Sequence, residues 1–591
     1  MKIYRKIWHF SFIWAPILYY HGLCNQAAIL LSLVALVFFL VFDLVRLNWE
    51  RGNEIVYRYL PWLLKDQERR TLNTSIYFAL SCLICATFFE RRVATLSIVL
   101  LCVGDPAAAI VGTRYGSIRI LNKSLQGSLA CFVSCYGVSR FLFDPTISFW
   151  AALTATFFEL ISSRLNDNLS VPIFSGLMVT SLLESPQLTG PMEYLLVFLK
   201  VYLTFVIVTS LVGIGLKHYI IHSHMRHYSA TYRPREGFCP SVSIIKPVFG
   251  LEGEDYANLA SFCEQRYQGD WEVVFVVQDR SDPILKTVDR LRIEFPERRI
   301  RTAFSRKDPQ TTDKMNNLIE GTRHARGDVL VYTDQPVRVA PDYLETVLAP
   351  MSDPRVGIVT SVAAYCGART IPAALNGYLV NMLGQSLYFA LAFFDRLDSA
   401  NGCTLGIRRE TYEEVGGFEA VAGQISDAHA LAQAVHKMGY RIHLLQRMTP
   451  VFLTALSVTE WLKRTHRMGV VYRAYAKHLY PLFLFQLGFV HALLYWWIYP
   501  DSPAGPILSL ASLLAETLSH LRMNYLWVKD RSAYLFAWLL PGLLFLAPIL
   551  WASAYFGRVV DWRGERYLVD QEGVVTRLRN TGAGEAPSAV V

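Results

Sequence analysis

Long apolar runs occupy both ends of the chain and leave a more polar block in the middle. A helix needs ~20 apolar residues to cross a bilayer; several runs are shorter, so the pattern leaves the number of spans open by one or two. A clean candidate span, residues 195–216, precedes the polar block. The other runs lie at 8–23, 25–45, 75–90, 93–113, 127–144, 146–162, 171–184, 480–499, 505–522 and 533–556. This pattern predicts a polytopic α-helical membrane protein.

The middle block, residues 235–455, alternates strand-like and helix-like patterns, which predicts an α/β domain inserted between the membrane segments. One of its apolar runs ends in Gln278-Asp279 and another in Thr333-Asp334. Each aspartate is then expected at the carboxyl end of a buried parallel strand, where open α/β sheets place nucleotide ligands. A nucleotide site tethered to a bilayer indicates an enzyme that modifies a lipid with an activated polar group.

Three segments, one inside this block and two after it, are interpreted from their composition. Residues 373–394 are apolar but interrupted by three amide side chains. They predict either an interfacial helix in the headgroup layer, where lipid would enter, or a buried core helix; the periodicity does not decide. Residues 456–478 are interpreted as an interfacial segment. Residues 558–591 are interpreted as a polar tail whose last part has a disorder-like composition.

Composition and charge agree with a membrane protein that carries an aqueous domain. Hydrophobic residues make up 53% of the chain, charged residues only 18%, and the formal net charge is +9. Much of the basic charge lies beside the apolar runs, as expected for anchoring next to anionic lipid. No nucleic-acid-binding motif accompanies that charge, so a nucleic-acid partner is not expected.

The ten cysteines are scattered, several of them within apolar runs, and we expect reduced, packed thiols facing a reducing cytosol. Cys82 and Cys85 form a Cys-x-x-Cys motif inside a predicted span, where packing is a simpler interpretation than zinc or redox chemistry. No cleavable secretory signal is expected, because the first apolar run lacks a convincing cleavage site and further spans follow it.

Six motifs follow one another through the middle block and the segment after it. They are VSIIKPVFGLE (242–252), VVQDRSDP (276–283), DKMNNL (313–318), TDQPVRV (333–339), NGCTLGIRRETYEEVGGF (401–418) and RTHRM (464–468). In this order they resemble the ceramide glucosyltransferase group of the family 2 glycosyltransferases, over about residues 195–575. The resemblance implies a GT-A-type, Rossmann-like domain and a UDP-sugar donor, with glucose as the sugar. It also implies a membrane lipid acceptor such as ceramide, a hopanoid or diacylglycerol.

The same resemblance implies roles for polar residues of the motifs. Asp334 would hold a divalent metal, Mg²⁺ or Mn²⁺, on the donor diphosphate, since carboxylates suit these ions. The leaving diphosphate also needs cationic neutralisation. Asp279 would contact the nucleoside, Lys314, Asn316 and Asn317 would line the donor pocket, and Arg464 and Arg467 would face the diphosphate or the interface. The simpler alternatives are strand-end turns for the aspartates, a solvated helix charge for the lysine and membrane anchoring for the arginines.

Three departures from the family pattern concern the general base, the arginine motif and the metal motif. The family's base lies in a Glu-Asp pair, whereas an ungapped alignment of QISDAHALAQAV places Asp427 at the Glu and Ala428 at the Asp. One residue on a helix is about 100° of rotation, so Asp427 serves as the catalytic base only if the preceding loop shifts by one residue. The family's Arg-Trp becomes Arg467-Met468, which loses an indole face and its N–H donor. Asp334 has no second carboxylate beside it.

Four motifs in the N-terminal third, about residues 1–190, carry a second resemblance. They are RKIWHF (5–10), GDPAAAIVGTRYGSIRI (104–120), NKSLQGSLACF (122–132) and, more weakly, ELISSRLNDNLSVP (159–172). They resemble CTP-dependent lipid kinases of the dolichol kinase, phytol kinase and yeast diacylglycerol kinase type, and distantly the phosphatidate cytidylyltransferases. The resemblance implies CTP as phosphate donor. Asp105 and Asp167 would carry metal, Lys123 and Ser124 would contact the nucleotide phosphate, and Asn168 would orient Asp167.

Glycines in these motifs have two interpretations. Gly104, Gly112, Gly116 and Gly127 allow a backbone to approach phosphates closely. Gly112 and Gly116 also form a Gly-x-x-x-Gly pattern, which packs helices closely, and the sequence leaves the two alternatives open. His9 is interpreted as an interfacial packing residue.

Two hypotheses follow for the whole chain. The first is a bifunctional lipid-modifying enzyme, an integral protein of a bacterial inner membrane, with both sites facing the cytoplasm, where UDP-sugars and CTP are found. The second makes the α/β domain a degenerate module that binds lipid or nucleotide sugar for an active kinase-like block. A processive polysaccharide synthase is a weaker third alternative, since only three apolar runs follow the α/β block.

Overall fold

The computed structural model describes residues 13–48, 56, 73–120, 123–161, 166–184, 190–227, 237–308, 311–476, 480–562 and 565–578. The RKIWHF motif with His9, most of the segment between the apolar runs at 25–45 and 75–90, and the chain after residue 578 lie outside this range. The chain divides into two compact units, Met1–Phe205 and Val206–Val591. The long helix α10, Pro191–His227, contributes residues to both units.

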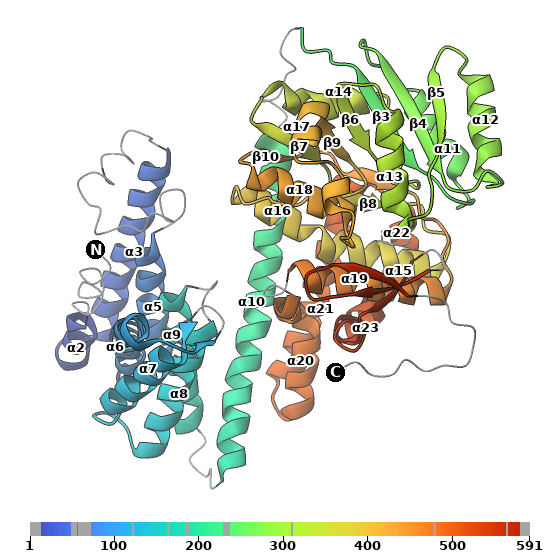
Figure 1. Ribbon diagram of the computed structural model, residues 1–591. Helices are drawn as coiled ribbons and strands as arrows, with labels where there is room; N and C mark the ends of the chain where they lie inside the picture. The colour runs from blue at the N-terminus through green and yellow to red at the C-terminus, as the bar shows by residue number, and fades with distance from the viewer. Residues whose placement is uncertain are drawn as a thin grey trace. The chain divides into compact units, whose positions relative to one another are not determined.

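The described elements of the first unit are helices and one short hairpin, and Figure 1 labels the helices. Side-chain caps start three of its helices: Asn73, Ser124 and Asn166 each accept a hydrogen bond from a backbone N–H of the first turn. The elements are α2 Trp14–His21, α3 Asn25–Asn48, α5 Thr74–Phe88, α6 Arg91–Tyr115, β1 Arg119–Ile120, β2 Lys123–Ser124, α7 Leu125–Ser139, α8 Pro145–Ile161 and α9 Asp167–Leu183.

Glycines bring α6 and α7 into close contact. A Cβ atom placed on Gly112 would lie 2.7 Å from Ser124 Oγ and 3.5 Å from Gly127 Cα. A Cβ on Gly104 would lie 2.7 Å from Cys135 Sγ. These contacts support the packing interpretation of the glycine pattern, because the space beside Gly104 and Gly112 is already filled by the neighbouring helix.

Among the described helices, three are long and apolar enough to cross a membrane. They are Asn25–Arg46, Arg91–Tyr115 and Pro191–Arg226. The other apolar helices of the first unit are shorter, among them α5, α8 and α9. The prediction of a helical membrane protein is therefore confirmed, with the long spans in the N-terminal part of the chain.

The second unit is built on a mixed sheet of seven strands, in the order β10-β7-β9-β6-β3-β4-β5. Its strands run parallel except β9, which is antiparallel to both of its neighbours. The strands and helices are β3 Val242–Pro247, α11 Asp255–Cys263, β4 Trp271–Val277, α12 Ile284–Glu294, β5 Arg299–Phe304, α13 Asp313–His324, β6 Val329–Tyr332, α14 Tyr343–Leu348, β7 Val356–Thr360, β8 Ala363–Tyr365, β9 Leu405–Arg408, α17 Arg409–Glu414, α18 Asp427–Lys437, β10 Arg441–Leu444 and β11 Thr449–Val451.

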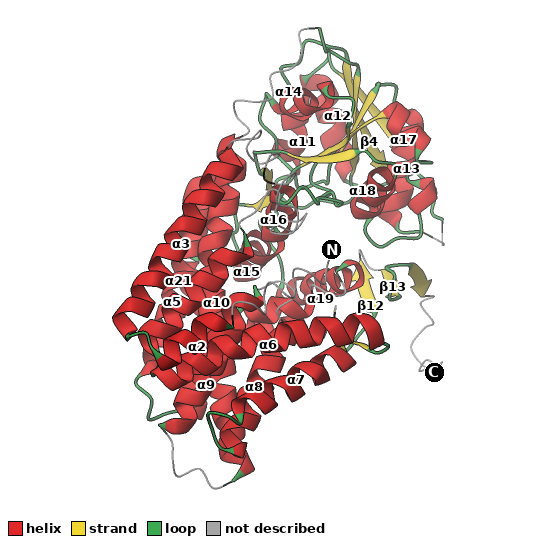
Figure 2. Cartoon of the chain, turned by 90° about the vertical axis from the view of Figure 1, so that its left-hand side faces the viewer, coloured by secondary structure: helices red, strands yellow, loops and turns green. Residues whose placement is uncertain are grey.

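Helices cover both faces of this sheet (Figure 2). One hydrophobic cluster joins the sheet to α13, α17 and α18, and a second joins its other face to α11, α12 and α14. Every residue of β3 and β6 is buried, as expected for central strands packed on both faces. The predicted GT-A-type α/β domain is confirmed.

Residues 373–394 form two helices joined by a wider turn: α15 Ile371–Leu379, η3 Val380–Gly384 and α16 Ser386–Phe393. Asn376 and Gln385 are 0% and 3% exposed, and Phe389 is fully buried. The structure therefore favours the core alternative for the centre of this segment, because two of the interrupting amides face protein. Asn381 binds the backbone N–H and carbonyl of Tyr365, which ties η3 to β8.

The chain after the sheet continues as α19 Val458–Tyr475, η5 Tyr480–Gln486, α20 Gly488–Ile498, α21 Ala504–Met523, α22 Ser532–Leu535 and α23 Leu540–Ser553. The apolar runs at 480–499 and 533–556 contain α20, with 11 residues, and α23, with 14, whereas α21 has 20. Short 3₁₀ segments lie beside α20 and α23, at Tyr480–Gln486 and Ala537–Leu539. The number of spans in this part of the chain therefore stays a prediction.

Part of the segment interpreted as a polar tail folds into strands. An antiparallel sheet, called the C-terminal sheet below, consists of β12 Val559–Trp562, β13 Glu565–Val569 and β14 Val575–Leu578. Val560, Tyr567, Val569 and Val575 are buried in one cluster with residues of α19 and η5. Alternation of apolar and polar residues places one face of this sheet against protein.

Replacing Gly112 by valine is expected to destabilise the first unit, because the new side chain would overlap Ser124 and the α7 backbone. Overpacking of this kind costs ~1–3 kcal/mol. Gly137→Val on α7 is the matched control, since nothing lies within 4 Å of a Cβ at that position. The thermal midpoint of the detergent-solubilised protein should fall for Gly112→Val only. Equal midpoints with loss of nucleotide binding would instead favour the phosphate interpretation.

Candidate active site

The two predicted strand-end aspartates lie at the same edge of the sheet. Asp279 follows β4 and Asp334 follows β6, and both strands pair in parallel with β3. Asp279 is exposed, and its carboxylate accepts hydrogen bonds from the backbone N–H and the hydroxyl of Ser281, at 2.8 and 2.7 Å. These bonds hold the pKa of Asp279 below its usual value. The side chain therefore stands as an anion at the open end of β4.

Lys314 joins Asp334 to Asp427. Its ammonium nitrogen lies 2.7 Å from Asp334 Oδ1 and 2.9 Å from Asp427 Oδ2. The lysine comes from the first turn of α13, and Asp427 is the first residue of α18. Burial by itself would lower the pKa of Lys314, but the two carboxylates outweigh it and raise the pKa, so the side chain is an ammonium.

Gly402 allows this group to assemble. Its carbonyl accepts a hydrogen bond from Asp334 N at 3.1 Å. A Cβ atom on Gly402 would lie 3.0 Å from both Asp334 Oδ2 and Lys314 Nζ. The glycine of the Asn-Gly-Cys motif is thus required for the close approach of a backbone segment to the ion pair.

Lys246 is a site residue that the motif analysis did not single out. It is fully buried in β3, and its ammonium donates to the backbone carbonyl of Asp334 at 2.6 Å and to Thr333 Oγ1 at 3.3 Å. The nitrogen lies 4.1 Å from the centre of the Phe262 ring. Burial lowers its pKa to about 7, against the attraction of nearby acids that include Asp334. A lysine inside an apolar strand is rare, and that signal could have identified it.

Asp334 is the carboxylate best placed to meet a cation. Burial alone would raise its pKa, but Lys314, Lys246 and Arg464 outweigh burial and lower it. Its side chain is 39% exposed, so it presents oxygen to an ion arriving from solvent. The next side chain, Gln335, turns away and binds Asp255 Oδ1 and the backbone around Gly250. No group of three or more His, Cys, Asp or Glu within the described residues could hold a metal, so most ligands would come from the donor and water.

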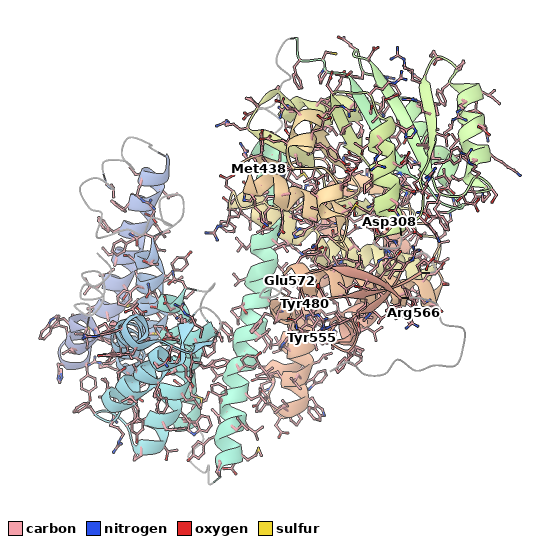
Figure 3. The ribbon with its side chains drawn as sticks, viewed as in Figure 1. Asp308, Met438, Tyr480, Tyr555, Arg566 and Glu572 are labelled. Carbon is pink, nitrogen blue, oxygen red and sulfur yellow. The ribbon has the colours of Figure 1, made fainter. Side chains whose placement is uncertain are left out.

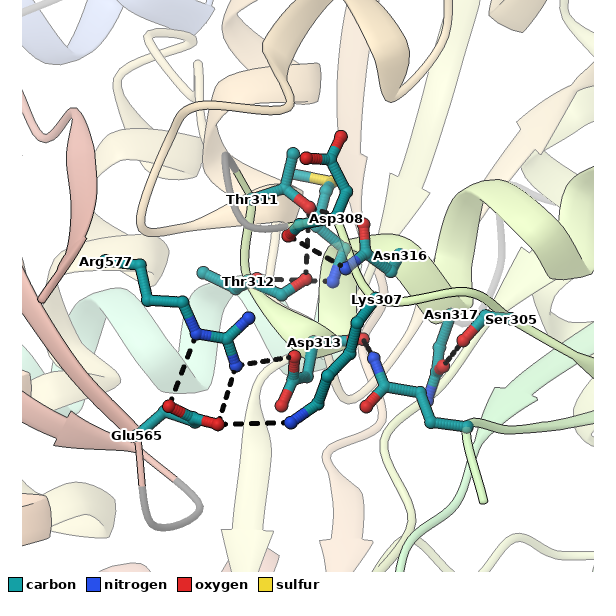
Figure 4. Close-up of polar contacts among 12 residues, drawn as sticks. Ser305, Lys307, Asp308, Thr311, Thr312, Asp313, Asn316, Asn317, Glu565 and Arg577 are labelled. Atoms are coloured by element: carbon teal, nitrogen blue, oxygen red, sulfur yellow. Dashed lines mark hydrogen bonds and ion pairs between the residues drawn. The ribbon is translucent and has the colours of Figure 1, made fainter. Parts of the chain in front are cut away.

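Asn316 and Asn317 hold the loop before α13. Asn317 accepts from the Ser305 hydroxyl and donates to Val276 O at 3.4 Å, and Asn316 accepts from the Thr311 hydroxyl (Figure 4). Both side chains are buried. The two asparagines thus fix the loop that borders the predicted donor pocket. Lys314 makes the contact with the carboxylates.

The two arginines of the RTHRM motif contact different parts of the protein. Arg464 donates to the Tyr365 hydroxyl at 2.9 Å and acts electrostatically on Asp334. Arg467 lies over the Trp562 ring of β12, 4.8 Å from its centre. Met468 lines an apolar cavity of about 90 Å³ with residues of η3, η5 and α23. Only Arg464 therefore belongs to the acidic centre.

Asp427 reaches the centre although the alignment shifts it by one residue. It stands at the start of α18, where its carboxylate meets Lys314, and Ala428 turns into the core at 4% exposed. The preceding segment ends at Ser426, whose N–H donates to the Tyr475 hydroxyl at 3.3 Å. The structure thus brings Asp334, Lys314, Asp427 and, through its charge, Arg464 together, and leaves Arg467 and the two asparagines outside.

The first unit has a separate polar cluster of its own. Lys123 forms an ion pair with Glu159 and also donates to its backbone carbonyl. Asp105 and Asp167 both act electrostatically on Glu159. Glu159 was not among the predicted site residues, although an acid within an apolar helix is a functional signal.

Two further predicted residues of this cluster have local roles. Ser124 caps α7, since its hydroxyl accepts from Gly127 N at 3.1 Å. The side-chain amide of Asn168 donates to Thr74 O at 3.3 Å, which fastens the start of α9 to α5. Lys123 thus pairs with Glu159, on which two further acids act electrostatically, while Ser124 and Asn168 fix helix ends of the same unit.

Comparison with known proteins agrees with this division. The model of the family described as glycosyl transferase family 21 matches residues 205–575. Ceramide glucosyltransferase 1 of Caenorhabditis elegans is 22% identical over 378 residues, covering 59% of this chain and 76% of the relative. The N-terminal region resembles CTP-dependent diacylglycerol kinase 1 of Saccharomyces cerevisiae, which is 27% identical over 216 residues, covering 31% of this chain and 74% of the relative.

The second unit is also similar to solved glycosyltransferase structures. The mannosyltransferase PcManGT from Pyrobaculum calidifontis, in complex with GDP-Man and Mn²⁺, is 19% identical, with a TM-score of 0.36. The match covers 60% of this chain and 98% of that chain.

Replacing Lys246 by methionine is expected to remove a pH-dependent contribution to stability. Its folded-state pKa is lowered from 10.5 to about 7, so between these values the unfolded chain binds a proton that the folded chain does not. The free energy of unfolding of the wild type should therefore rise with pH through this window, by on the order of 1 kcal/mol per pH unit. Below about pH 7 the folded state carries the full cost of the buried ammonium.

Thermal midpoints measured from pH 6.5 to 9 should thus rise more steeply in the wild type than in Lys246→Met. Lys286→Met changes an exposed lysine of α12 and should keep the wild-type slope. Equal slopes in all three proteins would contradict the lowered pKa.

Proposed function

The chain belongs to glycosyl transferase family 21, and we propose that it transfers glucose from UDP-glucose to the hydroxyl of a membrane lipid, with ceramide as the first acceptor to test. The observation that carries this proposal is the Asp334–Lys314–Asp427 group at the carboxyl edge of the sheet. It combines a carboxylate for a cation, an ammonium for a phosphate and a second carboxylate for a proton. The membrane-spanning helices support a lipid as acceptor.

Asp427 is the general base in this proposal. Its carboxylate takes the proton from the acceptor hydroxyl as the acceptor oxygen forms a bond to the anomeric carbon. The bond between that carbon and the diphosphate oxygen breaks, and UDP leaves with the electron pair. Asp427 is 13% exposed and paired with Lys314. Its carboxylate is therefore shielded from solvent until a phosphate group attracts the lysine away from it.

Cationic groups stabilise the leaving diphosphate. Lys314 and Arg464 both lie within electrostatic reach of Asp334 and supply positive charge where negative charge develops. Asp334 would hold a divalent cation, Mg²⁺ or Mn²⁺, which when bound supplies further charge neutralisation on the diphosphate. Asp279, exposed at the end of β4, would contact the nucleoside.

A second activity is proposed for the first unit, namely transfer of a phosphoryl group from CTP to a lipid alcohol. Lys123, held by Glu159 and close to Asp105 and Asp167, is the group that would meet the nucleotide phosphate. Both sites would face the cytoplasm, where CTP and UDP-sugars occur, and a bacterial inner membrane is the proposed location. The alternative, in which the α/β domain only binds its ligands, is distinguished by turnover of the sugar donor.

The sugar-transfer proposal is tested with purified protein in lipid vesicles, radiolabelled UDP-glucose and Mg²⁺ or Mn²⁺. Ceramide and diacylglycerol serve as separate acceptors. Asp334→Ala and Asp427→Asn should each lower lipid-soluble label by at least about 100-fold, the usual range for a lost charge-stabilising group or base. Asp289→Ala removes an exposed carboxylate of α12 and should retain wild-type activity. Full transfer by Asp427→Asn would exclude it as the base.

The kinase proposal is tested in the same vesicles with γ-labelled CTP and a panel of lipid alcohols. Lys123→Gln and Asp105→Asn should each reduce labelled lipid by at least about tenfold, whereas Glu90→Gln, an exposed residue before α6, should not. Lipid phosphorylation without any turnover of a sugar donor would make the α/β domain a binding module. No labelled lipid from CTP would refute the kinase proposal.

A further inference from the structure

The C-terminal sheet contacts the active centre from two sides. Its buried face belongs to a cluster that also contains Ile425, two residues before Asp427, and Val470 of α19. Arg566 and Glu572 mark this sheet in Figure 3, where Tyr480 and Tyr555 lie close to it. One face of the sheet is thus anchored in the protein. Other residues of β13, β14 and the turn between them make the polar contacts described next.

The first attachment reaches the start of α13. Arg577 Nη2 lies 3.2 Å from Asp313 Oδ1 and 2.9 Å from Glu565 Oε1, and Lys307 Nζ lies 3.1 Å from the same glutamate oxygen (Figure 4). The Arg577 and Asp313 side chains are 14% and 15% exposed. Most surface ion pairs contribute little to stability, but a guanidinium shared by two carboxylates at this degree of burial fixes geometry as well. Asp313 directly precedes Lys314.

The second attachment reaches the loop before α18. Val575 N donates to Gly423 O and Ile425 N donates to Gly573 O, both at 2.8 Å. These strand-like bonds hold the residues that lead into Asp427. The loop cannot slide by one residue without breaking both bonds, because the neighbouring amides would then face the wrong carbonyls.

Tyr475 of α19 also holds the loop before α18. Its hydroxyl donates to Gln424 Oε1 at 2.9 Å and accepts from Ser426 N at 3.3 Å. Gly573 has a φ of +80°, and a Cβ there would lie 2.8 Å from the Tyr475 ring. The turn between β13 and β14 therefore fits against the tyrosine only with glycine at this position.

We propose that the C-terminal sheet positions Lys314 and Asp427 relative to each other, and that Arg577 is the positioning residue on the donor side. Lys314 and Asp427 are 113 residues apart in the chain, yet the same three strands fasten both helix starts. This inference rests on the proposed sugar transfer for its catalytic consequence. A shift of about 1 Å in a reacting group can cost 100-fold in rate, so such an attachment has a measurable effect.

The test compares Arg577→Gln with Arg566→Gln in the full-length protein, using UDP-glucose and ceramide-containing vesicles. Arg566 is an exposed residue of β13 and serves as the matched control. The readout is the ratio of UDP-glucose hydrolysis to lipid transfer, which does not depend on the fraction of folded enzyme. A displacement of Lys314 relative to Asp427 should raise this ratio by about fivefold or more in Arg577→Gln, while Arg566→Gln keeps the wild-type ratio. An unchanged ratio in Arg577→Gln would overturn the proposal.

A double-mutant cycle identifies the partner through which Arg577 acts. Asp313→Asn combined with Arg577→Gln should be no more impaired than either single variant, because both remove one interaction. Arg577→Lys should restore part of the wild-type ratio. Independent, multiplicative effects of the two changes would show that Arg577 does not act through Asp313.

Hydrogen–deuterium exchange separates this inference from the proposed reaction. Peptides covering residues 311–317, at the start of α13, should exchange at least about tenfold faster in Arg577→Gln than in the wild type or Arg566→Gln, even if the wild type transfers no sugar to any lipid. Unchanged exchange would overturn the positioning role, whatever the activity. Absence of sugar transfer in the wild type together with faster exchange would refute the reaction and retain the structural role.

Discussion

The need to compensate one largely buried ammonium organises the active centre. Lys314 is 14% exposed, and a charge removed from water to this extent is costly unless it is paired and hydrogen-bonded. Asp334 and Asp427 provide that compensation from the end of β6 and the start of α18. Gly402 leaves the space in which the three groups can meet. Because Asp334 and Asp427 meet only through the cation between them, the positions of a strand end, two helix starts and a loop depend on one another.

The pairing with Lys314 explains why an acid shifted by one residue from the family pattern still reaches the centre. On a continuous helix, a one-residue shift would turn a carboxylate by about 100° and away from its target. Asp427, however, lies at the first position of α18, where the path of the preceding loop decides which side chain faces Lys314. That loop is paired with the C-terminal sheet through Gly423 and Ile425, so a tertiary contact sets the register of the helix start. Ala428, which the alignment places opposite the family's aspartate, is then free to pack in the core.

The sequence predicted the parts of the fold that rest on continuous local patterns. Apolar runs ending in Asp279 and Asp334 identified two central parallel strands, because strands buried on both faces carry few polar residues. The contact of Lys314 with Asp427 could not be predicted, since nothing local specifies a pairing across 113 residues. The C-terminal sheet was missed because its short strands carry alternating charges that resemble a solvated tail.

The two units use the same electrostatic arrangement at their candidate phosphate sites. Lys314 is paired with two aspartates in the second unit, and Lys123 is paired with Glu159, near Asp105 and Asp167, in the first. Burial alone would lower the pKa of Lys314, and its two carboxylate partners raise it. Pairing with carboxylates stabilises the ammonium. It also leaves the ammonium able to change partners, because a nucleotide phosphate offers oxygens of the same kind with more negative charge. Binding of the nucleotide can therefore exchange one anionic partner for another and release a carboxylate beside the reacting group. In the second unit the carboxylate released in this way is that of Asp427, so the pair that stabilises the resting centre would also supply its base at the moment the donor is bound.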